Sequence, residues 1–179
     1  GKMARRTSVL WIVCSAVALA VVPVALAEHT QVPVVRVHAQ TLVAAPPAAV
    51  WAWMTQGRNL VTWCPQWKAP VNAKASITRV GDVLEYTDEW GNGGRSVVTY
   101  MVKGKEMRVA HEPNKGDYMC QAKFVLEPSG AGTRVHLWDQ YTDESPAGDM
   151  QATAQKMETE LAGTLAALKR GVEGKVGQP

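Results

Sequence analysis

Between residues 75 and 142 the sequence alternates short runs typical of β-strands with clusters of turn residues. Glycine occurs in the breaks, as in Gly81-Asp82 and Gly91-Asn92-Gly93-Gly94, and it is the residue that tight hairpin turns most often require. No helical run separates these strands, although parallel strands need such a crossover. The pattern therefore predicts an antiparallel meander with strands at residues 76–80, 83–90, 96–102, 106–112, 117–127 and 133–142.

A further strand and three helical stretches flank this meander. Residues 34–43 alternate apolar and polar side chains, which predicts a half-buried strand. Short helices are expected within 48–54 and 58–63, and residues 149–173 repeat apolar side chains at helical spacing. We therefore expect an α+β fold in which a seven-stranded antiparallel sheet buries one face against a long C-terminal helix. If the sheet wraps this helix incompletely, a cavity remains between them.

Residues 1–27 differ in kind from the rest of the chain. Lys2, Arg5 and Arg6 precede an uncharged apolar run, which Pro23 and the small residues of Ala25-Leu26-Ala27 end. This order predicts a secretory signal peptide cleaved after Ala27, and hence a location in the bacterial periplasm or outside the cell. An uncleaved membrane anchor is the alternative. We expect residues 28–33 to form a flexible lead and residues 174–179 a flexible tail.

The net charge changes when this segment is set apart. The whole chain has 19 Lys and Arg against 16 Asp and Glu, a formal charge of +3. Three of these cations and none of the acids lie in residues 1–27, so the remainder is formally neutral. A neutral chain lacks the electrostatic signature of a nucleic-acid-binding protein, and we expect no such partner.

Two cysteines, Cys64 and Cys120, remain beyond the expected cleavage site. An even pair in an exported protein is compatible with a disulfide. Two separate buried thiols, each acting as a small apolar side chain, are the alternative. Spacing alone does not decide between them. The sequence contains no metal-ligand spacing, nucleotide-binding loop or hydrolase motif, so we expect neither a metal nor a cofactor.

Several short motifs occur in the order and spacing of a known family. They comprise a strand-to-helix entry, a helix end containing Trp63, two glycine turns and the end of the closing helix, at residues 43–51, 60–65, 80–82, 130–135 and 165–173. Residues 34–173 thereby resemble the START-like, or SRPBCC, superfamily, which includes polyketide cyclase/dehydratase, lipid-transport and birch-pollen-allergen proteins. The resemblance implies a helix-grip fold with a hydrophobic tunnel between sheet and helix.

Strand parity and helix spacing give the candidate ligand-binding residues. Asp139 shares the inward parity of the last strand, where a carboxylate on an apolar wall could act as an acid or a polar anchor. A solvated position near the cavity mouth is its alternative. The full set of candidates is Trp63, Tyr86, Tyr100, Tyr118, Cys120, Phe124, Leu137, Asp139, Met157 and Leu161.

These observations favour an exported carrier that holds a hydrophobic small molecule, such as a lipid, a sterol-like or an aromatic compound, and that contacts membranes during ligand exchange. A cyclase/dehydratase-type enzyme is the second hypothesis, with Asp139, Tyr86 or His111 as the acid or base. A protein-interaction module with a collapsed cavity is the third. The oligomeric state stays open.

Overall fold

The computed structural model describes residues 34–64, 76–87, 91, 93–114, 118–143 and 150–176. The expected signal peptide and lead, residues 1–33, lie outside the described residues.

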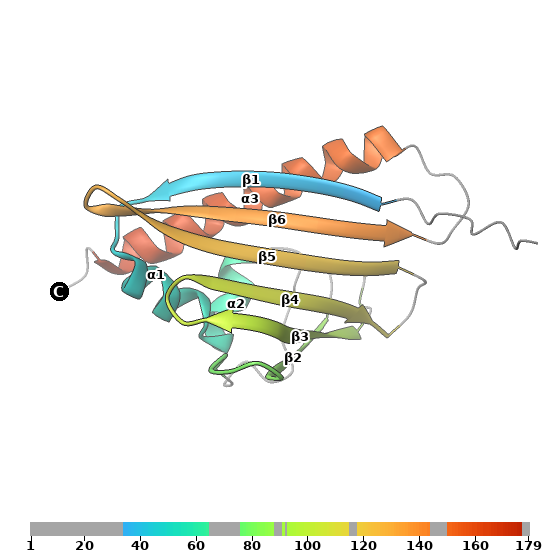
Figure 1. The fold of residues 1–179 in the computed structure, drawn as a ribbon, viewed down its shortest axis with the longest axis horizontal. Coiled ribbons are helices and arrows are strands. Elements are labelled where there is room, and N and C mark those ends of the chain that lie inside the picture. The colour runs from blue at the N-terminus through green and yellow to red at the C-terminus, as the bar shows by residue number, and fades with distance from the viewer. Residues whose placement is uncertain are drawn as a thin grey trace, which may run out of the picture. The chain divides into compact units, whose positions relative to one another are not determined.

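Six antiparallel strands form one sheet in the described part of the chain (Figure 1). The sheet runs in the order β1-β6-β5-β4-β3-β2, so the first strand pairs with the last and the others follow as hairpin neighbours. The strands are β1 (Val34–Val43), β2 (Val83–Thr87), β3 (Gly93–Val102), β4 (Glu106–Pro113), β5 (Tyr118–Ser129) and β6 (Gly132–Asp143).

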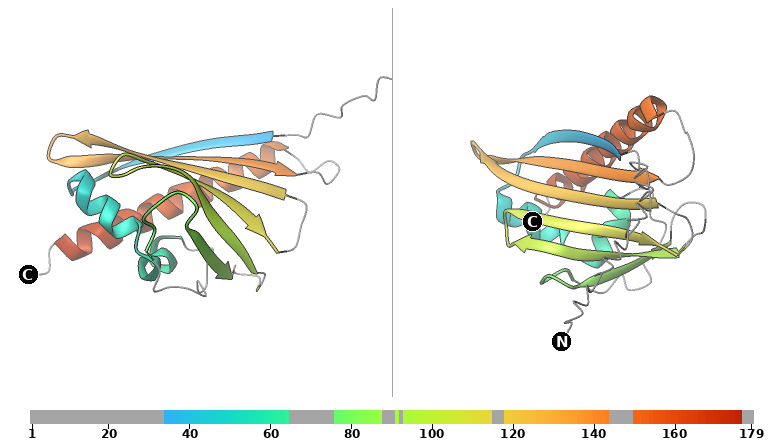
Figure 2. Two further views of the ribbon diagram at one scale, coloured as in Figure 1. Left: turned by 60° about the horizontal axis from the view of Figure 1, so that its bottom comes forward. Right: turned by 45° about the vertical axis from the view of Figure 1, so that its right-hand side comes forward.

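Three helices cover one face of this sheet, as the left view of Figure 2 shows. They are α1 (Pro47–Met54), α2 (Gly57–Trp63) and the long α3 (Met150–Val176). We call the covered face the inner face and the opposite one the outer face. Alternate strand residues point to each, and the inner set forms the apolar core together with the helices. The predicted combination of antiparallel sheet and long closing helix is thus confirmed.

Helix α3 is fixed to β1 and α1 near its C-terminal end. The Lys169 ammonium donates to the carbonyl oxygen of Leu42 at 2.5 Å, and the backbone N–H of Ala44 donates to the Glu173 carboxylate at 2.8 Å. Gly171 lies so close to the Trp53 indole that an added Cβ would approach its ring atoms to 2.8 Å. The helix continues through Val176, so residues 174–176 are helical rather than part of the expected tail.

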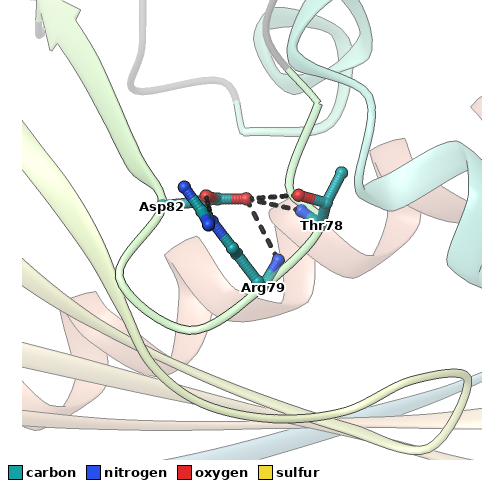
Figure 3. A network of polar contacts seen from close by, with 3 residues as sticks. All are labelled: Thr78, Arg79 and Asp82. Carbon is teal, nitrogen blue, oxygen red and sulfur yellow. Dashed lines mark hydrogen bonds and ion pairs between the residues drawn. The ribbon is translucent and has the colours of Figure 1, made fainter.

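The strand expected at residues 76–80 is not formed, which is why the described sheet has six strands rather than seven. Ser76 makes a single bridge to Gln56, and the chain then turns (Figure 3). The Asp82 carboxylate accepts hydrogen bonds from the backbone N–H groups of Thr78 and Arg79, at 2.7 and 3.0 Å, and from the Thr78 hydroxyl at 2.9 Å. These bonds satisfy the backbone locally, so the segment forms a turn instead of a sheet ladder.

Two glycines that were expected in a turn belong to β3. Gly94 lies directly opposite Tyr86, and a Cβ on Gly94 would meet the tyrosine ring at 2.5 Å. The missing side chain at Gly94 therefore creates the space into which the Tyr86 ring packs. The turn glycine is Gly91, whose φ of +83° is a conformation that other residues rarely adopt.

A β-bulge interrupts β3 between Val98 and Tyr100. Because an inserted residue reverses the alternation of side chains, Tyr100 faces outward and is 41% exposed. The prediction that Tyr100 lines the interior is therefore wrong. Met101 packs against the core in its place.

Candidate ligand-binding site

A cavity of about 50 Å³ lies between the inner face of the sheet and helices α2 and α3. That space holds about three water molecules, since each needs ~15 Å³ of such volume. Most of the lining is apolar, and its residues are Leu60, Trp63, Cys64, Ile77, Leu84, Ser96, Met107, Val109, His111, Ala122, Phe124, Leu137, Asp139, Leu161 and Thr164.

A partly buried carboxylate, Asp139 on β6, forms part of this wall. Burial raises its pKa from 3.8 to about 6, because the charged form loses its hydration. Hydrogen bonds from the Cys120 thiol, at 2.9 Å, and from the backbone N–H of Gln140 oppose the rise, while the nearby Glu160 carboxylate adds to it. Asp139 thus lies in an environment that favours its neutral form more than water does.

An imidazole, His111 on β4, lies in the same wall. Its Nδ1 is 2.7 Å from the hydroxyl oxygen of Ser96, directly opposite on β3. Burial lowers the pKa of His111 to about 4, so the ring is neutral near pH 7. The Tyr86 ring meets this imidazole edge to face, with centroids 6.4 Å apart.

These groups form a polar band across the inner face. Register places Ser96 opposite His111 and His111 opposite Cys120, whose thiol reaches Asp139 on the next strand. The band joins four strands, and Thr164 of α3 adds a hydroxyl to the lining. An apolar cavity with a few polar groups on one wall is the usual form of a small-molecule site.

Both cysteines are free thiols in the structure, so the disulfide considered for Cys64 and Cys120 is not formed there. Burial, and next the negative charge of Asp139, raise the pKa of each thiol above its ordinary value. A thiol kept protonated is a weak nucleophile. Cys120 serves here as a hydrogen-bond donor to Asp139.

Of the ten predicted ligand-binding residues, five line the cavity: Trp63, Phe124, Leu137, Asp139 and Leu161. Tyr86 and Cys120 do not line the cavity, but they contact the lining residues His111 and Asp139. Met157 packs against the core but does not line the cavity, and Tyr100 faces outward. The side chain of Tyr118 lies outside what the structure describes.

Sequence reasoning named His111 only as an alternative acid or base and missed most of the remaining lining. Alternation along the strand at residues 117–127 does predict an inward Ala122, and the structure places it in the lining. Ser96 and Val109 share inward parity with core residues on their strands, so strict alternation would have found them as well. Thr164 follows Leu161 at helical spacing. Ile77 gave no usable signal, since it enters the cavity from the turn region where a strand was expected.

The described residues show neither a metal-binding cluster nor a membrane-spanning helix. They contain no group of three or more His, Cys, Asp or Glu side chains placed to hold a metal ion. Within the same residues, every helix is too short or too polar to traverse a bilayer.

A curved antiparallel sheet closed by one long helix, with an apolar cavity between them, defines the helix-grip class of protein. The sequence pattern of the family "Polyketide cyclase / dehydrase and lipid transport" matches residues 34–173, and the chain belongs to that family. The predicted resemblance to START-like proteins is thereby confirmed. Among curated proteins, no sequence matches the chain.

Solved structures show the same fold at low sequence identity. Protein CV1439 from Chromobacterium violaceum is 14% identical with a TM-score of 0.61, over 77% of this chain and 96% of that one. Ara h 8.0201 is 13% identical with a TM-score of 0.62, over 79% and 99%. DynU16, a putative protein of the dynemicin biosynthetic locus, is 18% identical with a TM-score of 0.60, over 79% of this chain and 48% of its own.

Proposed function

We propose that the chain binds a small hydrophobic molecule in the cavity between the sheet and α3. The observation that carries the proposal is the combination, on one apolar wall, of a carboxyl group with a raised pKa and a neutral imidazole. Desolvation of the ligand's apolar part supplies the driving force. Asp139 and His111 then orient one polar group of the ligand. Family membership supports a hydrophobic ligand.

The size of the cavity adds a condition to this proposal. Its volume of about 50 Å³ is far below the roughly 300–1,000 Å³ of a drug-sized ligand site. A ligand of that size therefore has to displace lining side chains or α2 on entry. Met107 on the cavity wall has the flexible side chain that such adjustment requires.

An uncharged fluorescent probe, N-phenyl-1-naphthylamine, tests binding at this site. Ala122 is a buried lining residue, so Ala122→Leu fills the cavity and should abolish the rise in probe fluorescence. Ala162→Leu adds the same bulk at an exposed position of α3 and is the matched control. Equal probe binding by the parent chain and Ala122→Leu would contradict the proposed site, as would an absence of binding by the parent.

Acid–base catalysis of the cyclase/dehydratase type is the second candidate, favoured by the proximity of two ionisable groups to one apolar space. It predicts that Asp139→Asn and His111→Gln lose turnover of a cyclisable or dehydratable substrate while they keep probe binding. A carrier predicts that the parent chain binds the same compound and returns it unchanged. Product analysis by mass spectrometry, with the two variants as controls, separates the two functions.

We further propose that the protein acts outside the cytoplasm as a carrier, after cleavage of the signal segment following Ala27. The basic, apolar and small-residue order of residues 1–27 supports this location. Intact-mass measurement on protein from the periplasm of an expressing bacterium should show a chain that begins at Glu28. A chain of full mass held in the membrane fraction would identify the uncleaved anchor instead. Lipid retained in native mass spectrometry would support the carrier role.

A further inference from the structure

The outer face of the sheet carries a row of cations and aromatic rings that extends across five strands. Cross-strand register places its members directly opposite one another in the order His38, Trp138, Lys123, Arg108 and Tyr100. We call this set the cation–aromatic row. None of the described helices lies over it, since all three cover the inner face (Figure 2). The bulge in β3 is what brings Tyr100 to this face.

Contacts within the row hold its long side chains in place. The Lys123 ammonium lies 4.9 Å from the centroid of the Trp138 ring, and the Arg108 guanidinium lies 4.7 Å from that of Tyr100. The His38 ring stacks on Trp138 at a centroid separation of 4.5 Å. Side chains fixed by such packing lose less conformational freedom when a ligand binds than freely rotating surface cations do.

A groove of about 280 Å³ lies on this face, and it is larger than the inner cavity. Outward side chains around it are cations, amides, a hydroxyl and one indole: Arg36, Thr99, Arg108, Gln121, Lys123, Trp138 and Gln140. Asp139 contributes to the floor, but its carboxylate is directed to the inner face, where it accepts from Cys120. The groove is thus rich in hydrogen-bond donors and positive charge.

Charge in this region is only partly balanced. Glu106 lies 2.7 Å from Arg108 and 4.0 Å from Lys123, so one carboxylate serves two cations. Arg36 donates to the amide oxygen of Gln140 at 3.0 Å, which leaves its charge uncompensated by that contact. Lys123 and Arg108 are directly opposite on neighbouring strands, so the Glu106 carboxylate offsets the mutual repulsion of two cations at once.

We propose that this outer groove is a second binding site, for a small multivalent oxyanion such as a pyrophosphate group or a polycarboxylate. Arg36, Arg108 and Lys123 supply the positive charge, and the amides of Gln121 and Gln140 donate to further oxygens. An oxyanion between Lys123 and Arg108 removes their mutual repulsion. The site is separate from the inner cavity, so it does not depend on the function proposed above.

Titration of the isotopically labelled 179-residue chain with inorganic pyrophosphate, and separately with citrate, tests this site at low salt. Binding should shift the resonances of the Trp138 indole and of the Gln121 and Gln140 amides. The double variant Arg108→Gln/Lys123→Gln should weaken binding at least about tenfold, a loss of 1.4 kcal/mol. A preference for pyrophosphate identifies a phosphoryl ligand, and a preference for citrate identifies a carboxylate ligand.

Two single variants are the matched controls. Arg95→Gln removes an exposed cation of the same sheet that does not line the groove, and it should leave the affinity unchanged. Glu106→Gln removes the competing carboxylate and should tighten binding. The proposal is overturned if neither anion shifts these resonances, if Arg95→Gln weakens binding as much as the double variant, or if Glu106→Gln weakens it.

Discussion

Replacement of Asp139 by asparagine tests the electrostatics of the inner cavity most directly. Asparagine has nearly the same shape, and its side-chain oxygen can still accept the hydrogen bond from the Cys120 thiol. The substitution removes the ionisation of the side chain and replaces one of its two acceptor oxygens by an NH2 group. Because burial disfavours the carboxylate, we expect Asp139→Asn to stabilise the protein at neutral and alkaline pH.

The magnitude follows from the change in pKa on folding. A pKa that rises from 3.8 to about 6 corresponds to up to about 3 kcal/mol of lost stability when the group is fully ionised. The native state binds the proton more tightly than the unfolded state does, so this loss is absent below the unfolded pKa. It develops as the pH rises between the two values and is complete above the folded one.

The wild-type pH profile alone would hide this effect. His111 has its pKa lowered from 6.5 to about 4, so its contribution to stability is present above the unfolded pKa and disappears as the pH falls through the folded value. Between about pH 4 and pH 6 the two groups therefore act in opposite directions with similar magnitude. A difference measurement between parent and Asp139→Asn isolates the carboxylate.

Urea unfolding followed by tryptophan fluorescence, at several pH values between about 4 and 8, measures this difference. The variant should exceed the parent by about 2–3 kcal/mol near pH 8, and the gap should shrink toward zero near pH 4. Glu158→Gln, at an exposed position of α3, is the control and should show no comparable gain. A variant less stable than the parent at pH 8, or a gap independent of pH, would refute the reasoning.

Three further predictions concern stability. Gly171→Ala should lower the free energy of unfolding by about 1–3 kcal/mol, because the added Cβ meets the Trp53 indole. Gly163→Ala, on the same helix, meets nothing within 4 Å and should raise the free energy of unfolding by up to about 1 kcal/mol. Equal melting temperatures for the two variants would contradict this prediction. Ser96→Ala should cost about 1–3 kcal/mol in urea unfolding, because it removes the buried hydroxyl that is hydrogen-bonded to the partly buried His111. Thr159→Ala, at an exposed position, is the control and should cost under about 0.5 kcal/mol. Asp82→Ala should lower the melting temperature by several degrees, about 2–4 °C for each kcal/mol of lost stability, because the backbone N–H groups of Thr78 and Arg79 lose their acceptor. Asp82→Asn should give an intermediate melting temperature. An unchanged melting temperature would show that these hydrogen bonds do not stabilise the fold.

The periodicity of apolar residues in the sequence was sufficient to predict which side chains of a regular strand or helix are buried. Alternation placed Phe124, Leu137 and Asp139 on the inner face of the sheet, and three- and four-residue spacing placed Leu161 on the buried side of α3. These assignments hold because a regular strand or helix has one periodicity and one buried face. Short motifs in the expected order were sufficient for the family.

The failures have local physical causes that periodicity does not encode. A single inserted residue in β3 reversed the orientation of Tyr100, and hydrogen bonds to the Asp82 carboxylate replaced an expected strand by a turn. The Cys120–Asp139 contact depends on the register of two neighbouring strands, which neither strand specifies alone. Cavity volume depends on the packing of side chains from several distant segments, so no linear pattern reports it.

The pairing of β1 with β6 affects how the chain can fold. Arg36 and its partner Gln140 are 104 residues apart in sequence. The carbonyl oxygen of Ala45 accepts a hydrogen bond from the Thr133 hydroxyl, which is 88 residues away. The strands between them can form hairpins with their sequence neighbours, but β1 has no strand partner in the described sheet until β6 exists. Closure of so long a loop is slow. Because synthesis proceeds from the N-terminus, β1 and α1 also leave the ribosome long before β6 and α3. The sheet and its closing helix therefore stay incomplete until β6 and α3 have been synthesised.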